Sequence, residues 1–101
     1  MPKSLNDINA GDLAEMKNLA GCFFVPSQIA MMLELEPVAF GDAISEENQG
    51  TEIYNAYWGG WLQSEFDLRS SIMKMAKAGS TPAQAMMLEI MKLSKVKMVG
   101  T

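Results

Sequence analysis

The chain contains no histidine and only one cysteine, and these absences exclude most catalytic and metal-binding chemistry. Without histidine there is no Ser-His-Asp triad and no base to activate Cys22 as a nucleophile. Zinc sites with the usual histidine and cysteine ligands are excluded for the same reason. The carboxylates that could bind magnesium do not cluster anywhere in the sequence. We therefore predict a protein that is not an enzyme, with no cofactor and no metal.

Long hydrophobic runs are also missing. No stretch approaches the roughly 18 apolar residues that a membrane-spanning helix needs. The first residues, "MPKSLNDINAGD", hold one lysine and no apolar core, so we predict no signal peptide. Cys22 lies in the apolar stretch "AGCFFV" with no second cysteine, which predicts a buried, inert thiol. Together these features favour an intracellular protein that makes no membrane contact.

Charge is distributed unevenly around a net value of −4. Residues 1–67 carry eleven acids against Lys3 and Lys17, whereas residues 68–101 carry six bases against Glu89. This division favours attraction between the acidic and basic parts of different subunits, or a basic segment that faces phosphates. The alternative is two solvated helical surfaces that differ by chance.

The apolar spacing predicts an all-α fold, with a helix-turn-helix in residues 1–50 and a long antiparallel helical hairpin in residues 51–101, packed as one unit. A first helix is expected over residues 11–20, capped by Asn9 or Asp12. The apolar connection "CFFV" should then be buried. The inward stripe of this helix is expected from Leu13, Met16, Leu19 and Ala20.

The stretch "VPSQIAMMLELEPVAF", residues 25–40, has the pattern of a helix, a turn and a second helix. Pro26 and Pro37 suit the first turns of the two helices. Ala30 is small enough for a close helix approach, and Glu34 stands where such motifs usually have glycine, a left-handed position that other residues occupy at a cost. The inward faces are expected from Ile29, Ala30, Met32 and Leu33, then Val38, Phe40 or Gly41, and Ile44.

Two further helices are predicted over residues 52–78 and 82–95, capped by Thr51 and Thr81 and separated at Gly79, with a frayed end after them. The last helix is apolar on most sides, so it should be buried on more than one face. Such a surface favours subunit contacts; the alternative is that the N-terminal helices fold back over it. The expected anchors are Tyr57, Trp58, Trp61, Phe66 and Met73.

Gly59 and Gly60 lie inside the predicted long helix, in "YWGGW". Each glycine costs a helix interior about 1 kcal/mol relative to alanine. A close helix crossing or a kink is the simplest feature that would offset this cost.

The order of these segments resembles the small subunit of a tailed-phage or prophage terminase. The resemblance rests on "PSQIAMMLEL" at 26–35, "YWGG" at 57–60 and "LRSSIMKMAKAGSTPAQAMML" at 68–88. It implies a non-catalytic homo-oligomer, such as a ring, in the cytoplasm of a bacterial host. In that family the small subunit binds viral double-stranded DNA for packaging and delivers it to a large ATPase and nuclease subunit.

The predicted second helix has no arginine or lysine, the residues that commonly contact guanine. DNA binding is therefore expected to be weak per subunit and to depend on many linked contacts. Two alternatives stay open: a small helix-turn-helix transcriptional regulator, usually dimeric, and an assembly module that does not bind DNA. The candidate DNA contacts are Lys3, Lys17, Ser27, Gln28, Asn48 and Gln49.

Overall fold

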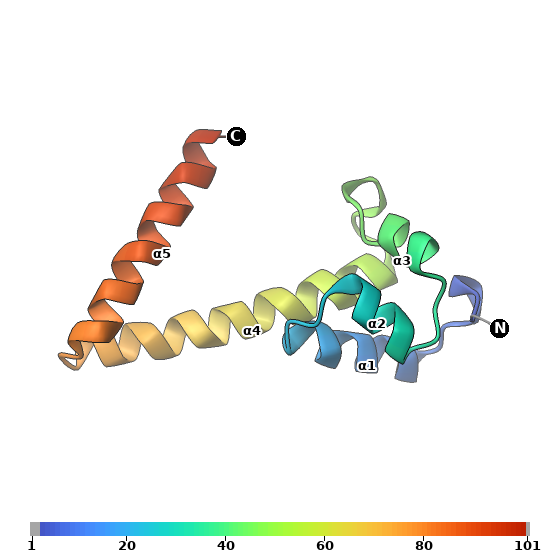
Figure 1. Ribbon diagram of the computed structural model, residues 1–101, viewed down its shortest axis with the longest axis horizontal. Coiled ribbons are helices and arrows are strands. Elements are labelled where there is room, and N and C mark those ends of the chain that lie inside the picture. The colour runs from blue at the N-terminus through green and yellow to red at the C-terminus, as the bar shows by residue number, and fades with distance from the viewer. Residues whose placement is uncertain (1–2, 101) are drawn as a thin grey trace. The chain divides into compact units, whose positions relative to one another are not determined.

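The computed structural model describes the backbone of residues 3–100 and the side chains of residues 3–95. Over this range the regular elements are all helices, which confirms the all-α prediction, and an isolated bridge joins Lys3 and Leu35. The elements in chain order are η1 (Leu5–Asp7), α1 (Ala10–Gly21), α2 (Pro26–Met32), α3 (Pro37–Ala43), η2 (Glu46–Asn48), α4 (Glu52–Lys77) and α5 (Thr81–Gly100) (Figure 1).

The internal contacts divide the chain into two compact units after Glu65, within α4. From the sequence we predicted two regions, 1–50 and 51–101, that pack together as one compact unit. The boundary falls later because the first half of α4 contributes Tyr57 to the core of the N-terminal unit.

Helix α1 begins with a reciprocal cap formed by the two residues that the sequence offered as alternatives. Asn9 Oδ1 accepts from the Asp12 amide at 2.8 Å, and Asp12 Oδ2 accepts from the Asn9 amide at 3.2 Å. Lys3 Nζ lies 3.0 Å from the same Asp12 oxygen. The two cap hydrogen bonds satisfy the amides of Asn9 and Asp12, which have no partner within the helix. The ion pair links the N-terminal arm to the start of α1.

The connection from α1 to α2 is largely exposed, so the prediction that it is buried was wrong. Cys22 is exposed, and Phe23 and Val25 keep 44% and 50% of their surface. Phe23 occupies the left-handed region, with φ 63°, because the chain must reverse direction at the end of α1. The ring of Phe23 packs edge-on against Trp61 at 5.3 Å, and Phe24 packs against the core.

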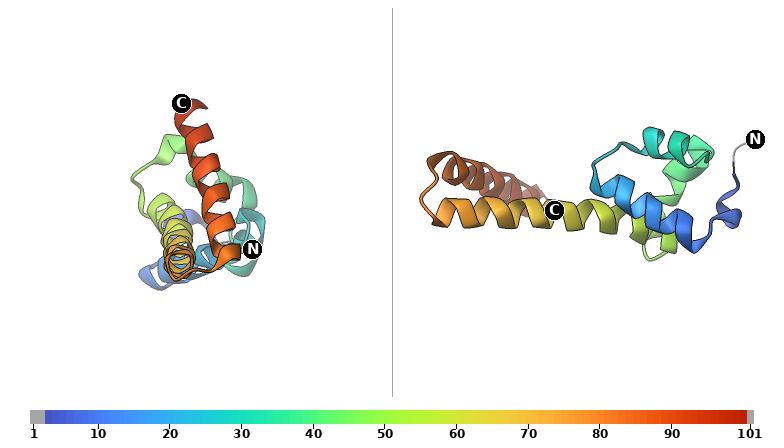
Figure 2. Two further views of the ribbon diagram at one scale, coloured as in Figure 1. Left: turned by 90° about the vertical axis from the view of Figure 1, so that its left-hand side faces the viewer. Right: turned by 90° about the horizontal axis from the view of Figure 1, so that it is seen from below.

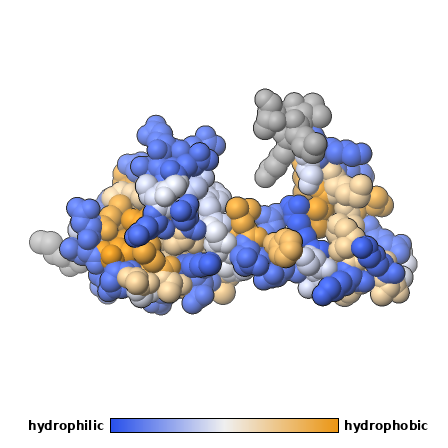
Figure 3. Space-filling view, turned by 180° about the vertical axis from the view of Figure 1, so that it is seen from behind, coloured by the Kyte–Doolittle hydropathy of each residue, from blue (hydrophilic) through white to orange (hydrophobic). Residues whose placement is uncertain are grey.

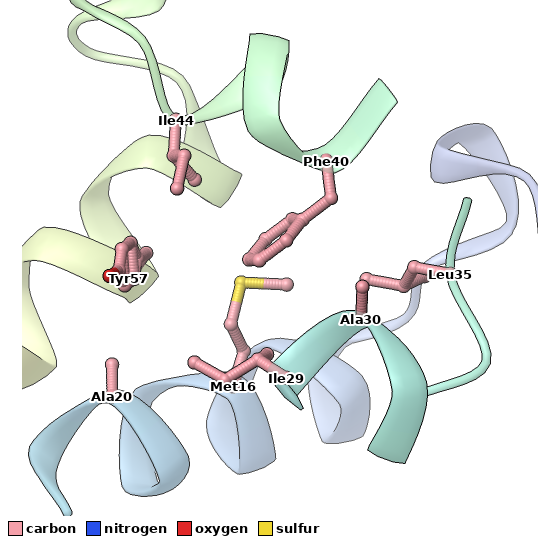
Figure 4. Close-up of a cluster of buried hydrophobic side chains, with 8 residues drawn as sticks. All are labelled: Met16, Ala20, Ile29, Ala30, Leu35, Phe40, Ile44 and Tyr57. Carbon is pink, nitrogen blue, oxygen red and sulfur yellow. The ribbon is translucent and has the colours of Figure 1, made fainter. Parts of the chain in front are cut away.

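The core of the N-terminal unit lies between α1, α2, α3 and the start of α4. In Figure 4 the side chains of Met16, Ile29 and Phe40 point toward one another, and all three are fully buried. Met32 and Val38, which were expected to face inward, are 52% and 70% exposed. Helices of seven residues direct only one or two positions each toward the core. The full set is Met16, Ala20, Ile29, Ala30, Leu35, Phe40, Ile44 and Tyr57.

The turn between α2 and α3 depends on Glu34, which has a left-handed backbone with φ 58°. The amide of Leu35 donates to the carbonyl of Ala30 at 2.7 Å and closes the end of α2. Ala30 is fully buried, as its small size predicted. A short side chain at this position leaves room for the close packing of α2 and α3.

The first half of α4 begins with a side-chain cap and is held in the N-terminal unit by a hydrogen bond and a close helix crossing. Thr51 Oγ1 accepts from the Tyr54 amide at 3.2 Å, as predicted, and Trp58 Nε1 donates to the Ile44 carbonyl at 2.8 Å. A Cβ atom built on Gly60 would lie 2.9 Å from the carbonyl carbon of Lys17 and closer still to its oxygen, so it would collide with the α1 backbone. The close helix crossing that the two glycines suggested therefore exists at Gly60.

The C-terminal unit comprises the end of α4, the turn and α5. Gly79, with φ 103°, ends α4, and Ser80 Oγ accepts from the Ala83 amide at 3.3 Å, so Ser80 rather than Thr81 caps α5. Gln84 Nε2 also donates to the Ala76 carbonyl beside the turn at 3.0 Å.

Helix α5 continues to Gly100, beyond the predicted end at residue 95, so the expected fraying is not observed in the backbone. In Figures 1 and 2, α5 leaves the end of α4 at the turn instead of lying along it. Side-by-side packing of the two helices as an antiparallel hairpin is therefore not confirmed. Apolar side chains at the end of α4 and along the described part of α5 therefore remain exposed to solvent.

Candidate interaction surfaces

Most of the predicted DNA contacts are engaged within the chain. The Lys3 ammonium pairs with Asp12, and Gln28 Oε1 accepts from the Val25 amide at 3.1 Å as part of the α2 cap. The hydrogen bond from Lys3, reinforced by that from the Asn9 backbone, holds the pKa of Asp12 below its ordinary value of 3.8. Lys3 therefore has a structural partner.

The other candidates come from η2 and the residue after it, from α1 and from α2. Asn48 Nδ2 donates to the Asp42 carbonyl at 2.8 Å, and Gln49 Nε2 lies 3.4 Å from Tyr54 Oη. Lys17 and Ser27 are exposed, on α1 and α2 respectively. None of the hydrogen bonds described joins two of the six candidates. Among the described residues, these hydrogen bonds therefore bring none of the candidates together.

The N-terminus of α3 is occupied by a carboxylate of the chain itself. Glu36 Oε1 accepts from the Val38 amide at 3.2 Å, and Glu36 Oε2 accepts from the Ala39 amide at 2.6 Å. Backbone amides at such a position otherwise suit a phosphate or another anion. Glu36 satisfies them internally and, with the exposed Glu34 before it, gives this end of α3 a negative charge.

The whole N-terminal unit has the same sign. Residues 1–65 contain ten acids against two lysines, a net charge of −8, and residues 66–101 contain six bases against two acids, a net charge of +4. The sequence showed this imbalance, but only the fold assigns the two charges to two compact units.

The C-terminal unit exposes much of its apolar surface. Among its described residues only Ile72 and Ala83 are buried hydrophobics. In Figure 3, hydrophobic and hydrophilic side chains lie side by side over the end that holds α5 and the turn. A few hundred Å² of contiguous apolar surface is the usual maximum on a monomer, and larger patches mark contact sites. The exposed large hydrophobics of this unit are Phe66, Leu68, Met73, Met75, Met86, Leu88, Met91 and Leu93.

The predicted interface anchors separate into three groups by their exposure. Phe66 and Met73 are exposed and available for a partner, and Phe66 retains 65% of its surface. The prediction that Tyr57 is an interface anchor was wrong, because its ring packs beside Phe40 and is buried in the core of the N-terminal unit. This burial raises the pKa of the Tyr57 hydroxyl. Trp58 and Trp61 are half-buried, the first bonded to Ile44 and the second packed on Phe23.

A groove lies in the C-terminal unit, with a volume of about 400 Å³. Phe66, Met73 and Met87 supply its apolar lining, and Arg69, Lys74 and Lys77 supply its positive charge. We call it the basic groove. Sequence reasoning missed it, although Phe66, Arg69, Met73 and Lys77 recur at the three- to four-residue spacing that places them on one helix face.

Within the described part of the chain, no three acidic or cysteine side chains are grouped so that they could hold a metal ion. No buried side-chain polar atom lacks a hydrogen-bond partner in this range. None of the described helices has the length and hydrophobicity required to span a bilayer. No protein-family model, curated protein or solved structure matches the chain.

Proposed function

We propose that this chain is a non-catalytic, self-associating DNA adaptor of the kind found as small subunits of phage terminases. One observation carries the proposal: the C-terminal unit leaves most of its large apolar side chains in solvent. Burial of apolar surface stabilises by roughly 25 cal/mol per Å², so a second copy that covers this unit gains substantial free energy. Self-association is therefore the function that the exposed surface favours.

The N-terminal unit supports the DNA-binding part of the proposal through its local geometry. Helices α2 and α3 are short, closely packed and joined through a left-handed Glu34 over a fully buried Ala30. These are the features expected of a helix-turn-helix. Lys17 and Ser27 are the exposed polar candidates beside this pair of helices.

The charge of this unit limits what one copy can do. Affinity for DNA scales with the number of phosphates that cations neutralise, and a net charge of −8 with Glu36 at the start of α3 opposes it. Many linked weak contacts in an oligomer would still add avidity. The same observation favours a second candidate function: an assembly module in which the α2–α3 surface binds protein and no DNA.

Self-association is tested with two matched leucines. Leu88 on α5 and Leu62 on the first half of α4 are each 57% exposed. Leu88→Glu should lower the light-scattering mass, because a carboxylate replaces buried apolar surface at the proposed interface, an effect on the order of tenfold or more in association. Leu62→Glu should keep the parent mass. A monomeric parent, or a Leu88→Glu variant at the parent mass, contradicts the proposed interface.

DNA binding is tested by measuring affinity against salt for the parent and for Leu88→Glu. We expect binding by the oligomer that weakens steeply with salt, and a shallow, weak response from the dissociated variant. Tight, sequence-selective binding by the dissociated variant would favour a transcriptional regulator. An intact oligomer that fails to bind DNA at low salt would favour the assembly module.

A further inference from the structure

The basic groove and the α2–α3 turn have complementary chemistry. The groove combines apolar Phe66, Met73 and Met87 with the exposed cations Lys74 and Lys77. Hydrophobic side chains beside positive charge suit a partner that presents the same apolar character beside negative charge.

The α2–α3 turn presents such a surface. Met31 and Val38, on either side of the turn, are 80% and 70% exposed, and Met32 is 52% exposed. The exposed carboxylates of Glu34 and Glu36 lie between them in the sequence. We call these five residues the acidic ridge. A single copy of the chain gains nothing from holding these apolar side chains in water, so the ridge is suited to contact with protein.

We propose that the acidic ridge of one copy docks into the basic groove of a neighbouring copy. This inference rests on the self-association proposed above and names its contact surfaces. The charge balance supports it, because the unit with the ridge has a net charge of −8 and the unit with the groove +4. A groove paired with another groove would instead place Lys74 and Lys77 against the same lysines, which is unfavourable.

A contact between two different surfaces has a consequence for assembly. Each copy that uses its ridge still has a groove to offer, so the contact repeats from copy to copy. Such head-to-tail contacts produce a ring when the rotation closes and a filament when it does not. The contact also gives the negatively charged start of α3 a role in binding protein, which explains its lack of cations. DNA binding by the assembled oligomer then uses surfaces outside the ridge, such as the exposed Lys17 on α1.

A nucleic acid is the competing occupant of the groove, because its lysines would also attract phosphates. The apolar lining favours protein, since phosphate contacts draw no benefit from Met73 and Met87. The two occupants are separated experimentally by following assembly mass and DNA affinity in the same variants.

The test is a charge swap in the full chain. Lys74→Glu with Lys77→Glu inverts the groove, and Glu34→Lys with Val38→Lys inverts the ridge; all four positions are exposed, so the fold should tolerate the changes. Each pair should weaken association on the order of tenfold or more, and raised salt should weaken the parent. The variant with all four changes should regain the parent mass, because the two inverted surfaces attract again.

Matched controls carry the same charge changes elsewhere. Glu46→Lys with Glu47→Lys alters the exposed η2, and Lys17→Glu alters an exposed position of α1 outside the ridge and the groove. Both should keep the parent mass. If they disperse the oligomer as strongly as the groove and ridge variants, net charge rather than docking controls assembly and the inference is wrong.

Other outcomes also decide the question. A groove variant that keeps the parent mass but loses DNA affinity assigns the groove to nucleic acid and overturns the inference. Dispersal without recovery in the fourfold variant shows that the ridge is not the groove's partner. If the parent assembles and no groove or ridge variant changes its mass, only this inference fails. A monomeric parent contradicts the proposed self-association as well.

Discussion

Replacing the two adjacent glycines of α4 by alanine, one at a time, should change stability in opposite directions. A Cβ on Gly60 would lie 2.9 Å from the Lys17 carbonyl carbon and 3.0 Å from its Cα, and closer still to its oxygen. These are backbone atoms of α1, so relief requires the helix to move. A Cβ on Gly59 meets nothing within 4 Å.

The magnitude follows from two opposing terms. Alanine gains about 1 kcal/mol over glycine within a helix, which is the whole effect expected for Gly59→Ala. Overpacking a well-filled contact costs roughly 1–3 kcal/mol, and a rigid backbone neighbour places Gly60→Ala at the upper end. The net expectation is a stabilisation of about 1 kcal/mol for Gly59→Ala and a destabilisation of about 2 kcal/mol for Gly60→Ala.

Thermal unfolding followed by far-ultraviolet circular dichroism measures the difference. For a domain of this size about 1 kcal/mol shifts Tm by roughly 4–8 °C, so the two variants should bracket the parent clearly. All three proteins must be compared at one concentration, because association stabilises by mass action. A Gly60→Ala variant as stable as Gly59→Ala would refute the close crossing of α1 and α4.

Two further substitutions probe local features of the N-terminal unit. In the dissociated Leu88→Glu background, Glu34→Gly should stabilise the fold by about 1 kcal/mol in denaturant unfolding, because glycine adopts the observed φ of 58° without a side-chain penalty. An unchanged or lower midpoint there would contradict the left-handed turn. The pKa of Asp12 lies below 3.8 in the folded chain. The stability that its carboxylate contributes to the fold is therefore complete above pH 3.8 and is lost as the pH falls through the lower folded pKa. Asp12→Asn should therefore lose less stability than the parent on acidification from neutral pH, as measured by denaturant titration at each pH, and an identical loss would show that the pair with Lys3 contributes nothing.

Local signals in the sequence were sufficient for the helices and several of their caps. Asn9 and Thr51 cap α1 and α4 as their side-chain chemistry predicts, and Gly79 ends α4 with a positive φ. Ala30 is buried and Glu34 is left-handed, as expected for the turn between α2 and α3. These features depend on residues a few positions apart, so periodicity and capping rules are enough to find them.

The sequence was less informative about which apolar residues are covered. Cys22 and Val38 lie in apolar or periodic stretches but are exposed, whereas Tyr57 was expected at an interface and is buried. Burial depends on which other element arrives at a position, and spacing along one helix does not contain that information. The candidate DNA residues show the same limit, because Lys3 and Asn48 bond to groups nine and six positions away, beyond a helix's own i+3 or i+4 neighbours.

The sequence by itself determined the helical content, the absence of histidine-based chemistry and the opposite charges of the two ends of the chain. Tertiary structure alone decided that Gly60 permits a close helix crossing and that Glu36 occupies the start of α3. It also placed Phe66, Met73 and Lys77 around one groove with Met87. The first group of properties follows from residue counts or from residues a few positions apart in the chain. The second depends on distances between residues that only folding brings together.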